Sequence, residues 1–138
     1  MPERNVSCAL LAEPHHGLAE GVRSLLGTVF EAVVMVADQT SLIEAAERLN
    51  PHPQLAVVDL CLVKEDINGF VCRLRARCHG LRVIFLSEHG DATVARSVLG
   101  AEANGLVVRR RIASDLLAAV DAVLRGERYG FNSESSNP

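Results

Sequence analysis

The fold is decided by the stretch LAVVDL at residues 55–60, in which an apolar run leads to an acid, Asp59. Its apolar residues follow one another without polar alternation, which predicts a β-strand buried on both faces of a sheet. In an open parallel sheet, residues at the carboxyl ends of the strands line the ligand crevice. Asp59 stands at that end, so it is either a functional carboxylate or a cap that accepts a backbone hydrogen bond from the following loop.

Similar apolar stretches recur along the chain and alternate with helical patterns. We predict the other strands at 6–12, 32–37, 81–87 and 106–108. Helices are predicted at 17–26 and 91–99, and three more are expected to begin after Asp38 or Thr40, near Phe70 and after Ser114. Five strands that alternate with five helices predict right-handed crossovers. The expected class is therefore α/β, a doubly wound five-stranded parallel sheet covered on both faces.

Length and composition indicate one globular domain, which we expect at 5–126, followed by a polar linker or tail at 127–138. The net charge is −3 and basic residues are not in excess, so this chain is not expected to bind nucleic acid by itself. No apolar run approaches the length of a membrane span, and the first residues lack the layout of a signal peptide. A cytoplasmic location without a membrane partner is expected.

The cysteines and histidines form no spaced ligand set. No pair of cysteines has the two-residue spacing of a metal knuckle or redox motif, so buried reduced thiols are expected. The adjacent His15 and His16 could contact a metal, but neighbouring histidines on a loop are expected instead to serve as turn or solvent groups. Arg73, Arg75 and Arg77 form a row on one helix, which predicts a solvated helix face.

The residues that end four of the predicted strands suggest a reaction. They are Glu13, Asp59, Ser87 and Arg109, and a doubly wound sheet brings them to one edge of the molecule. Two carboxylates, a hydroxyl and a fixed cation suit phosphoryl transfer, because a carboxylate can form an aspartyl phosphate. A divalent ion between the acids would neutralise the transferred charge, and the hydroxyl and cation would hold phosphate oxygens.

Read in order, the segments of the chain resemble the receiver domain of bacterial two-component response regulators over nearly the whole length. The matching motifs are LLAEPH at 10–15, VVDL at 57–60, LS at 86–87 and ANGLVVR at 103–109. The ending LRGERY at 124–129 further resembles the linker of the NarL/FixJ-like subfamily, whose receivers precede a helix-turn-helix DNA-binding domain.

The resemblance implies a flavodoxin-like (βα)5 receiver fold and a signalling role in a phosphorelay. Asp59 would accept a phosphoryl group from a histidine kinase, and Ser87 and Arg109 would contact the phosphate. Such a domain is not an enzyme beyond slow self-phosphorylation and dephosphorylation. Family receivers often dimerise, so a homodimer is expected. DNA would be contacted only through a domain that this chain lacks, as part of transcription regulation.

Several positions depart from the family pattern. Pro14 stands where the family has a second acid, so magnesium would be held only weakly, by Glu13, Asp59 and the carbonyl of Cys61. Arg109 replaces a lysine. The planar guanidinium of arginine differs in shape from the compact ammonium of lysine, so the replacement is not conservative at a tight phosphate site. Leu106 replaces a switch aromatic. Glu102 occupies a helix end where glycine is preferred, which predicts mild strain if its backbone is left-handed.

Two functions remain open from these residues. The first is a phospho-receiver of weak or atypical activity, favoured by Asp59 and Ser87. The second is a pseudo-receiver that acts as a protein-interaction or dimerisation module without phosphorylation, favoured by Pro14, Arg109 and Leu106. A small flavodoxin-like ligand-binding protein is a third alternative. It would need a glycine- or hydroxyl-rich phosphate loop, which residues 13–17 do not provide.

Overall fold

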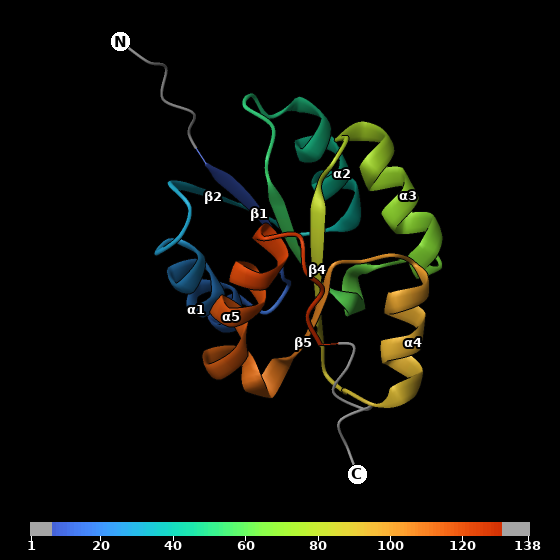
Figure 1. The fold of residues 1–138 in the computed structure, drawn as a ribbon. Helices are drawn as coiled ribbons and strands as arrows, with labels where there is room; N and C mark the ends of the chain where they lie inside the picture. Colours follow the sequence, from blue (N-terminus) through green and yellow to red (C-terminus); the bar gives the residue numbers. More distant parts are fainter. Residues whose placement is uncertain (1–6, 131–138) are drawn as a thin grey trace.

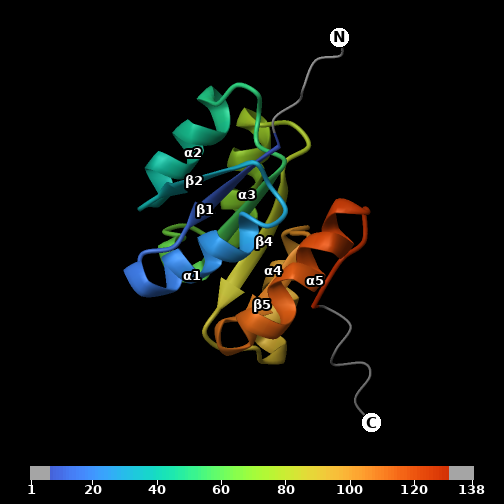
Figure 2. The ribbon, with the colours of Figure 1, turned by 90° about the vertical axis from the view of Figure 1, so that its left-hand side faces the viewer.

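A computed structural model describes residues 7–130 of the chain. Its strands form one sheet in the order β2-β1-β3-β4-β5, and every neighbouring pair is parallel (Figures 1 and 2). The strands are β1 (Cys8–Ala12), β2 (Ala32–Val36), β3 (Leu55–Asp59), β4 (Arg82–Ser87) and β5 (Gly105–Val108). The predicted doubly wound parallel sheet is therefore confirmed, with LAVVD as its central strand β3.

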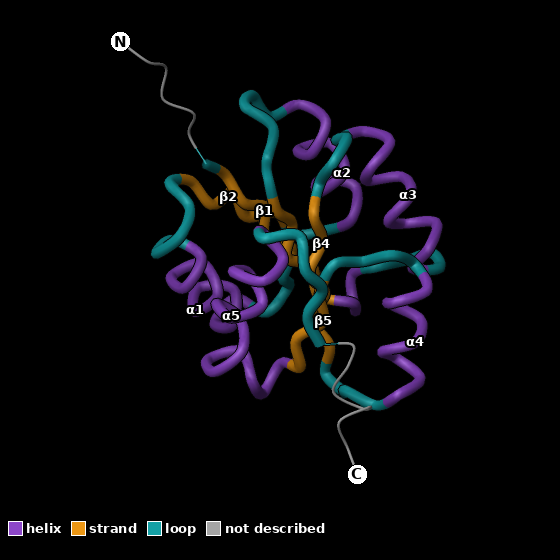
Figure 3. The backbone as a smooth tube through the Cα atoms, in the orientation of Figure 1, coloured by secondary structure: helices purple, strands orange, loops and turns teal. Residues whose placement is uncertain are grey.

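Helices cover both faces of this sheet, as Figure 3 shows around the central strands. They are α1 (His16–Leu26), α2 (Gln39–Arg48), α3 (Ile67–Arg77), α4 (Ala92–Gly100) and α5 (Ile112–Leu124), with short 3₁₀ helices η1 (Leu60–Leu62) and η2 (Arg109–Arg111). α1 and α5 lie on one face, and α2, α3 and α4 on the other (Figure 1). No helix within residues 7–130 is long and apolar enough to cross a bilayer.

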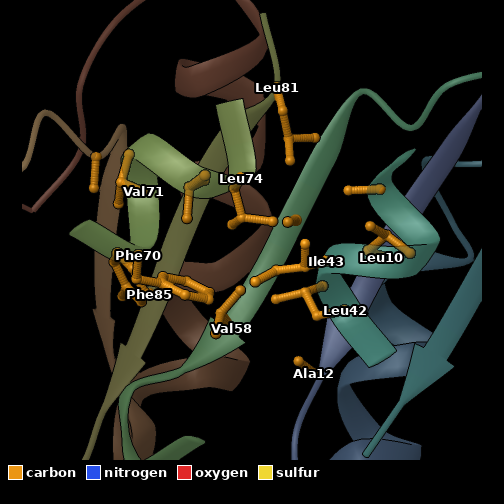
Figure 4. Packing of buried hydrophobic residues seen from close by; sticks show 14 of the residues in the cluster. Leu10, Ala12, Leu42, Ile43, Val58, Phe70, Val71, Leu74, Leu81 and Phe85 are labelled. Carbon is orange, nitrogen blue, oxygen red and sulfur yellow. The ribbon is translucent and has the colours of Figure 1, made fainter. Parts of the chain in front are cut away.

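The core consists of two apolar layers, one on each face of the sheet. Alternate residues of a strand face opposite layers, so Leu10 packs towards α2 and α3 while Leu11 packs towards α1 and α5. Figure 4 shows the first layer, in which the rings of Phe70 and Phe85 lie with centroids 6.0 Å apart. Every residue of β1 and β3 is buried, so the packed core fixes the position of the carboxyl ends of these strands.

Aspartates begin three of the α-helices by accepting a backbone N–H in the first turn. Asp38, Asp66 and Asp91 cap α2, α3 and α4, respectively. The predicted cap at Ser114 is wrong, because α5 starts earlier, at Ile112, directly after η2. The Ser114 hydroxyl instead donates to the carbonyl of Arg111.

The arginine row on α3 is not wholly a solvated face, which corrects the prediction. Arg75 is half-buried and donates to the carbonyls of Leu81 and Glu102 and to Oδ1 of Asn104, at 3.1, 2.9 and 2.7 Å. Glu102 has the left-handed backbone expected at this helix end, with φ of 63°. Arg75 therefore ties α3 to the turn between α4 and β5, and only Arg73 and Arg77 are exposed.

Two other expectations, for the cysteines and for the C-terminal tail, agree only partly with the structure. Cys8 and Cys78 are buried, but Cys61 and Cys72 are exposed, so the prediction of buried thiols is wrong for half of them. Within the predicted tail, Tyr129 forms a parallel bridge with Gly105, the first residue of β5. The domain boundaries themselves stay a prediction, because residues 1–6 and 131–138 lie outside the described part of the chain.

Candidate functional site

Asp59 lies at the carboxyl end of β3, between the ends of β1 and β4, and is only 1% exposed. Its Oδ1 accepts the backbone N–H of Cys61 at 2.9 Å, so the expected cap of the following loop is present. Its Oδ2 accepts a hydrogen bond from Nη2 of Arg109 at 2.7 Å. Asp59 is therefore more than a loop cap, because a cation that follows the edge strand β5 also binds it.

Arg109 follows β5 directly and reaches past the end of β4 to Asp59. Its side chain is 23% exposed, and its Nε is buried without a hydrogen-bond partner among the described residues. The hydrogen bond to Asp59 raises the pKa of Arg109, so the guanidinium stays charged. A planar fork with a free N–H beside a carboxylate is suited to holding a further oxygen, such as one of a phosphoryl group.

Glu13 directly follows β1, and its side chain is wholly buried. Its Oε2 accepts the backbone N–H of His15 at 3.0 Å and lies 2.7 Å from the Nδ1 of the same residue. Its Oε1 has no hydrogen-bond partner within residues 7–130. One oxygen thus holds the turn that follows β1, while the other remains available.

The two carboxyl groups of the site influence each other's protonation. Burial raises the pKa of Glu13, and the neighbouring Asp59 raises it further. Burial also raises the pKa of Asp59, but interactions with Glu13, the Cys61 N–H and Arg109 outweigh burial, so this pKa is lowered overall. Asp59 is therefore the carboxylate that ionises first, and Glu13 holds its proton to higher pH.

Ser87 ends β4 and is 4% exposed. Its hydroxyl donates to the carbonyl of His89 and accepts the His89 N–H. With Asp59 and Arg109 it lines an open cavity of about 240 Å³. The full lining is Asp59, Leu60, Cys61, Ser87, Glu88, His89, Val94 and Arg109. Three of the four predicted residues thus share one cavity, and the fourth, Glu13, lies next to Asp59.

The oxygen donors for a divalent ion fit magnesium only in part. Pro14 is exposed and offers no carboxylate, whereas the unpartnered Oε1 of Glu13 could coordinate a cation. A histidine also enters the group: donor atoms of Glu13, His15 and Asp59 all lie within 4.8 Å of one another. From sequence, contact with a metal is the less favoured of the two expectations for His15. Its position two residues after Glu13, across a proline, was the available signal.

Cys61 contributes its backbone rather than its thiol to the site. Its N–H binds Asp59, and the predicted role of its carbonyl as a metal ligand stays a prediction. Burial and the nearby Asp59 carboxylate raise the pKa of the thiol to about 11. The thiol is therefore neutral near pH 7 and does not supply a thiolate.

Comparison with known proteins supports the resemblance predicted from sequence, although no family model matches the chain. The transcriptional activator protein ExaE of Pseudomonas putida is 32% identical over 123 residues, which cover 87% of this chain and 56% of that protein. The chain spans only 51% to 60% of the length of the curated relatives it matches.

Solved structures share the fold at low sequence identity. A two-component response regulator of the LuxR family from Aurantimonas sp. SI85-9A1 matches with a TM-score of 0.77 and 22% identity, covering 91% of this chain and 89% of that one. The isolated receiver domain of RcsB from Salmonella enterica serovar Typhimurium, in the presence of phosphomimetic BeF3-, matches with 0.75 and 18% identity over 93% and 97%. The chain therefore has the fold of response-regulator receiver domains, which confirms the predicted resemblance.

Proposed function

We propose that this chain is a signalling receiver that accepts a phosphoryl group on Asp59 from a histidine kinase. The observation that carries the proposal is the buried, preferentially ionised Asp59, which shares a cavity with the Ser87 hydroxyl and is bound by the Arg109 guanidinium at 2.7 Å. A carboxylate nucleophile, a hydrogen-bond donor and a fixed cation are groups that promote phosphoryl transfer to an acid. The similarity to response regulators supports the same function.

In the transfer, an oxygen of Asp59 bonds to phosphorus while the bond from phosphorus to the donor histidine breaks. The electron pair of that bond stays with the imidazole, which takes a proton from water. Arg109 would compensate part of the new negative charge, and its unpartnered Nε–H offers a further donor. The Ser87 hydroxyl would have to exchange the His89 carbonyl for a phosphoryl oxygen.

We further propose that this phosphorylation is weak. Both oxygens of Asp59 are engaged before any phosphate arrives, one by the Cys61 N–H and the other by Arg109. Because the ion pair is largely buried, opening it to expose the nucleophile costs free energy that a solvated lysine would not demand. The incomplete set of oxygen ligands for magnesium lowers the rate further, since the metal neutralises the transferred group.

A second candidate, a pseudo-receiver that binds partners without phosphorylation, is favoured by the same ion pair and by Leu106. Arg109 already supplies charge compensation to unmodified Asp59. Leu106 is 6% exposed and packs in the apolar layer beneath α2, α3 and α4. Leu106 has no ring or hydroxyl that could change position when Asp59 is phosphorylated.

Exposure to acetyl phosphate or beryllofluoride with saturating magnesium separates the two functions. A receiver gains the mass of one phosphoryl group with acetyl phosphate, and Asp59→Asn abolishes the gain. Equal behaviour of wild type and Asp59→Asn would exclude phosphotransfer and favour the pseudo-receiver.

The partners follow from the proposed function. The donor would be a cytoplasmic histidine kinase, and the active form a homodimer. ExaE is named a transcriptional activator, and a structure of RcsB shows it bound to a promoter. By analogy, we propose that DNA is contacted through a separate domain rather than through this one.

A further inference from the structure

We infer that Glu13, His15 and Asp59 form a binding site for a divalent first-row transition-metal ion, which this site prefers to magnesium. The site supplies one imidazole nitrogen and two carboxylate oxygens. The inference deepens the proposed function and rests on it for its role, because the ion would lie beside the phosphoacceptor. Binding itself can be measured on the unphosphorylated protein.

The geometry of the three side chains suits a small ion. Their donor atoms all lie within 4.8 Å of one another. Zinc-like ions bind nitrogen and oxygen at roughly 2.0–2.2 Å, which places neighbouring donors about 3–3.5 Å apart. The trio therefore needs only a modest contraction around an ion.

The buried Oε1 of Glu13 is the independent observation that points to a ligand. The side chain has no exposed surface, and this oxygen has no hydrogen-bond partner within residues 7–130. An unsatisfied buried polar atom costs about 1–3 kcal/mol. A cation between Glu13 and Asp59 would satisfy it.

The local backbone places the imidazole beside these oxygens. The His15 N–H binds Oε2 of Glu13, so the turn from Glu13 to His15 is compact, and Pro14 fixes the backbone between them. The His15 side chain is 58% exposed and touches Glu13 through Nδ1. Moving Nδ1 from Oε2 to an ion would therefore disturb no packed element.

The chemistry of the donors decides which ion is preferred. Magnesium requires near-octahedral oxygen ligands, whereas imidazole suits zinc, cobalt, nickel and copper. Pro14 removes an oxygen ligand and His15 supplies a nitrogen. Compared with an all-oxygen site, this ligand set therefore favours a transition-metal ion over magnesium. The positive charge of Arg109 at Oδ2 of Asp59 lowers the affinity for every divalent ion alike and leaves the preference unchanged.

The test is titration of the tag-free chain with Co2+, followed by visible absorption, and with Zn2+ and Mg2+, followed by calorimetry. We expect one Co2+ or Zn2+ per chain, at an affinity at least about tenfold above that for Mg2+. His15→Ala should weaken Co2+ binding by at least the roughly tenfold loss that removal of an outer-shell partner causes. His16→Ala is the matched control, since His16 is an exposed histidine outside the trio, and should bind as wild type.

Thermal unfolding of His15→Ala shows whether that variant is folded, and Glu13→Gln provides a second loss of a ligand. Unchanged Co2+ binding in His15→Ala, equal losses in His16→Ala, or Mg2+ affinity equal to that of Co2+ would overturn the inference. Failure of the proposed function looks different. Metal then binds as inferred, but Asp59 gains no phosphoryl group with any ion.

Discussion

The ion pair between Arg109 and Asp59 should be a main source of stability at the site, which Arg109→Met tests. Removing one partner of a fully buried pair costs about 3–5 kcal/mol, whereas an exposed pair contributes about 0–1 kcal/mol. Here Asp59 is buried, but the Arg109 side chain is 23% exposed and the Cys61 N–H still binds the carboxylate in the variant. We therefore expect a loss of about 2–3 kcal/mol in the free energy of unfolding at pH 7.

The loss should depend on pH in a defined direction. The pKa of Asp59 is lowered in the folded protein, so its contribution is complete above its unfolded pKa of about 3.9 and disappears as the pH falls through the folded pKa. Urea unfolding at pH 7 and at progressively lower pH measures this, with Arg110→Met as the control on the same 3₁₀ helix. A loss below about 0.5 kcal/mol at pH 7, or the same loss in an Asp59→Asn background, would refute the reasoning.

Three further predictions concern neighbouring features. Pro14→Asp should tighten Mg2+ binding by at least about tenfold in calorimetry, and unchanged affinity would contradict our account of the missing ligand. Arg75→Met should lower the free energy of unfolding by about 2–4 kcal/mol, because three acceptors lose their donor. The exposed Arg73→Met should cost less than about 1 kcal/mol, and equal losses would argue against a structural role for Arg75. Glu13 has a raised pKa, so its stability contribution is present below its unfolded pKa of about 4.3 and is lost as the pH rises through the folded pKa. Glu13→Gln should therefore gain stability over wild type as the pH rises in urea unfolding, and a pH-independent difference would contradict this assignment.

The fold could be predicted because its signals are local and repeated. An apolar run such as LAVVD has few alternatives when helical patterns flank it, and five repetitions fix the parallel sheet. The misplaced start of α5 has a physical cause: residues 109–111 form a 3₁₀ turn that continues into the helix, so no separate cap is needed. The role of Arg75 depends on acceptors 6, 27 and 29 residues away, which no local pattern on α3 reveals.

The candidate site could be predicted as a set of residues but not as a set of contacts. The ends of parallel strands meet at one edge, which is why Glu13, Asp59, Ser87 and Arg109 were found together. Sequence does not show that Arg109 already binds Asp59, since this depends on the reach of one side chain across β4. It also does not show that His15 turns back on Glu13, because an exposed histidine in a loop usually faces water.

These contacts connect the departures at Pro14 and Arg109 through the charge balance of the site. Asp59 and Arg109 balance each other's charge, and burial raises the pKa of Glu13, so the ion pair itself carries no net charge that requires a divalent ion. A family-type acid at position 14 would have added a charge that demanded one. Phosphorylation replaces the single negative charge of Asp59 with the roughly −1.5 to −2 charge of a phosphoryl group near pH 7, which one guanidinium cannot balance. Phosphorylation therefore creates the need for a cation, and His15 with the free Oε1 of Glu13 is the place where the structure can hold it.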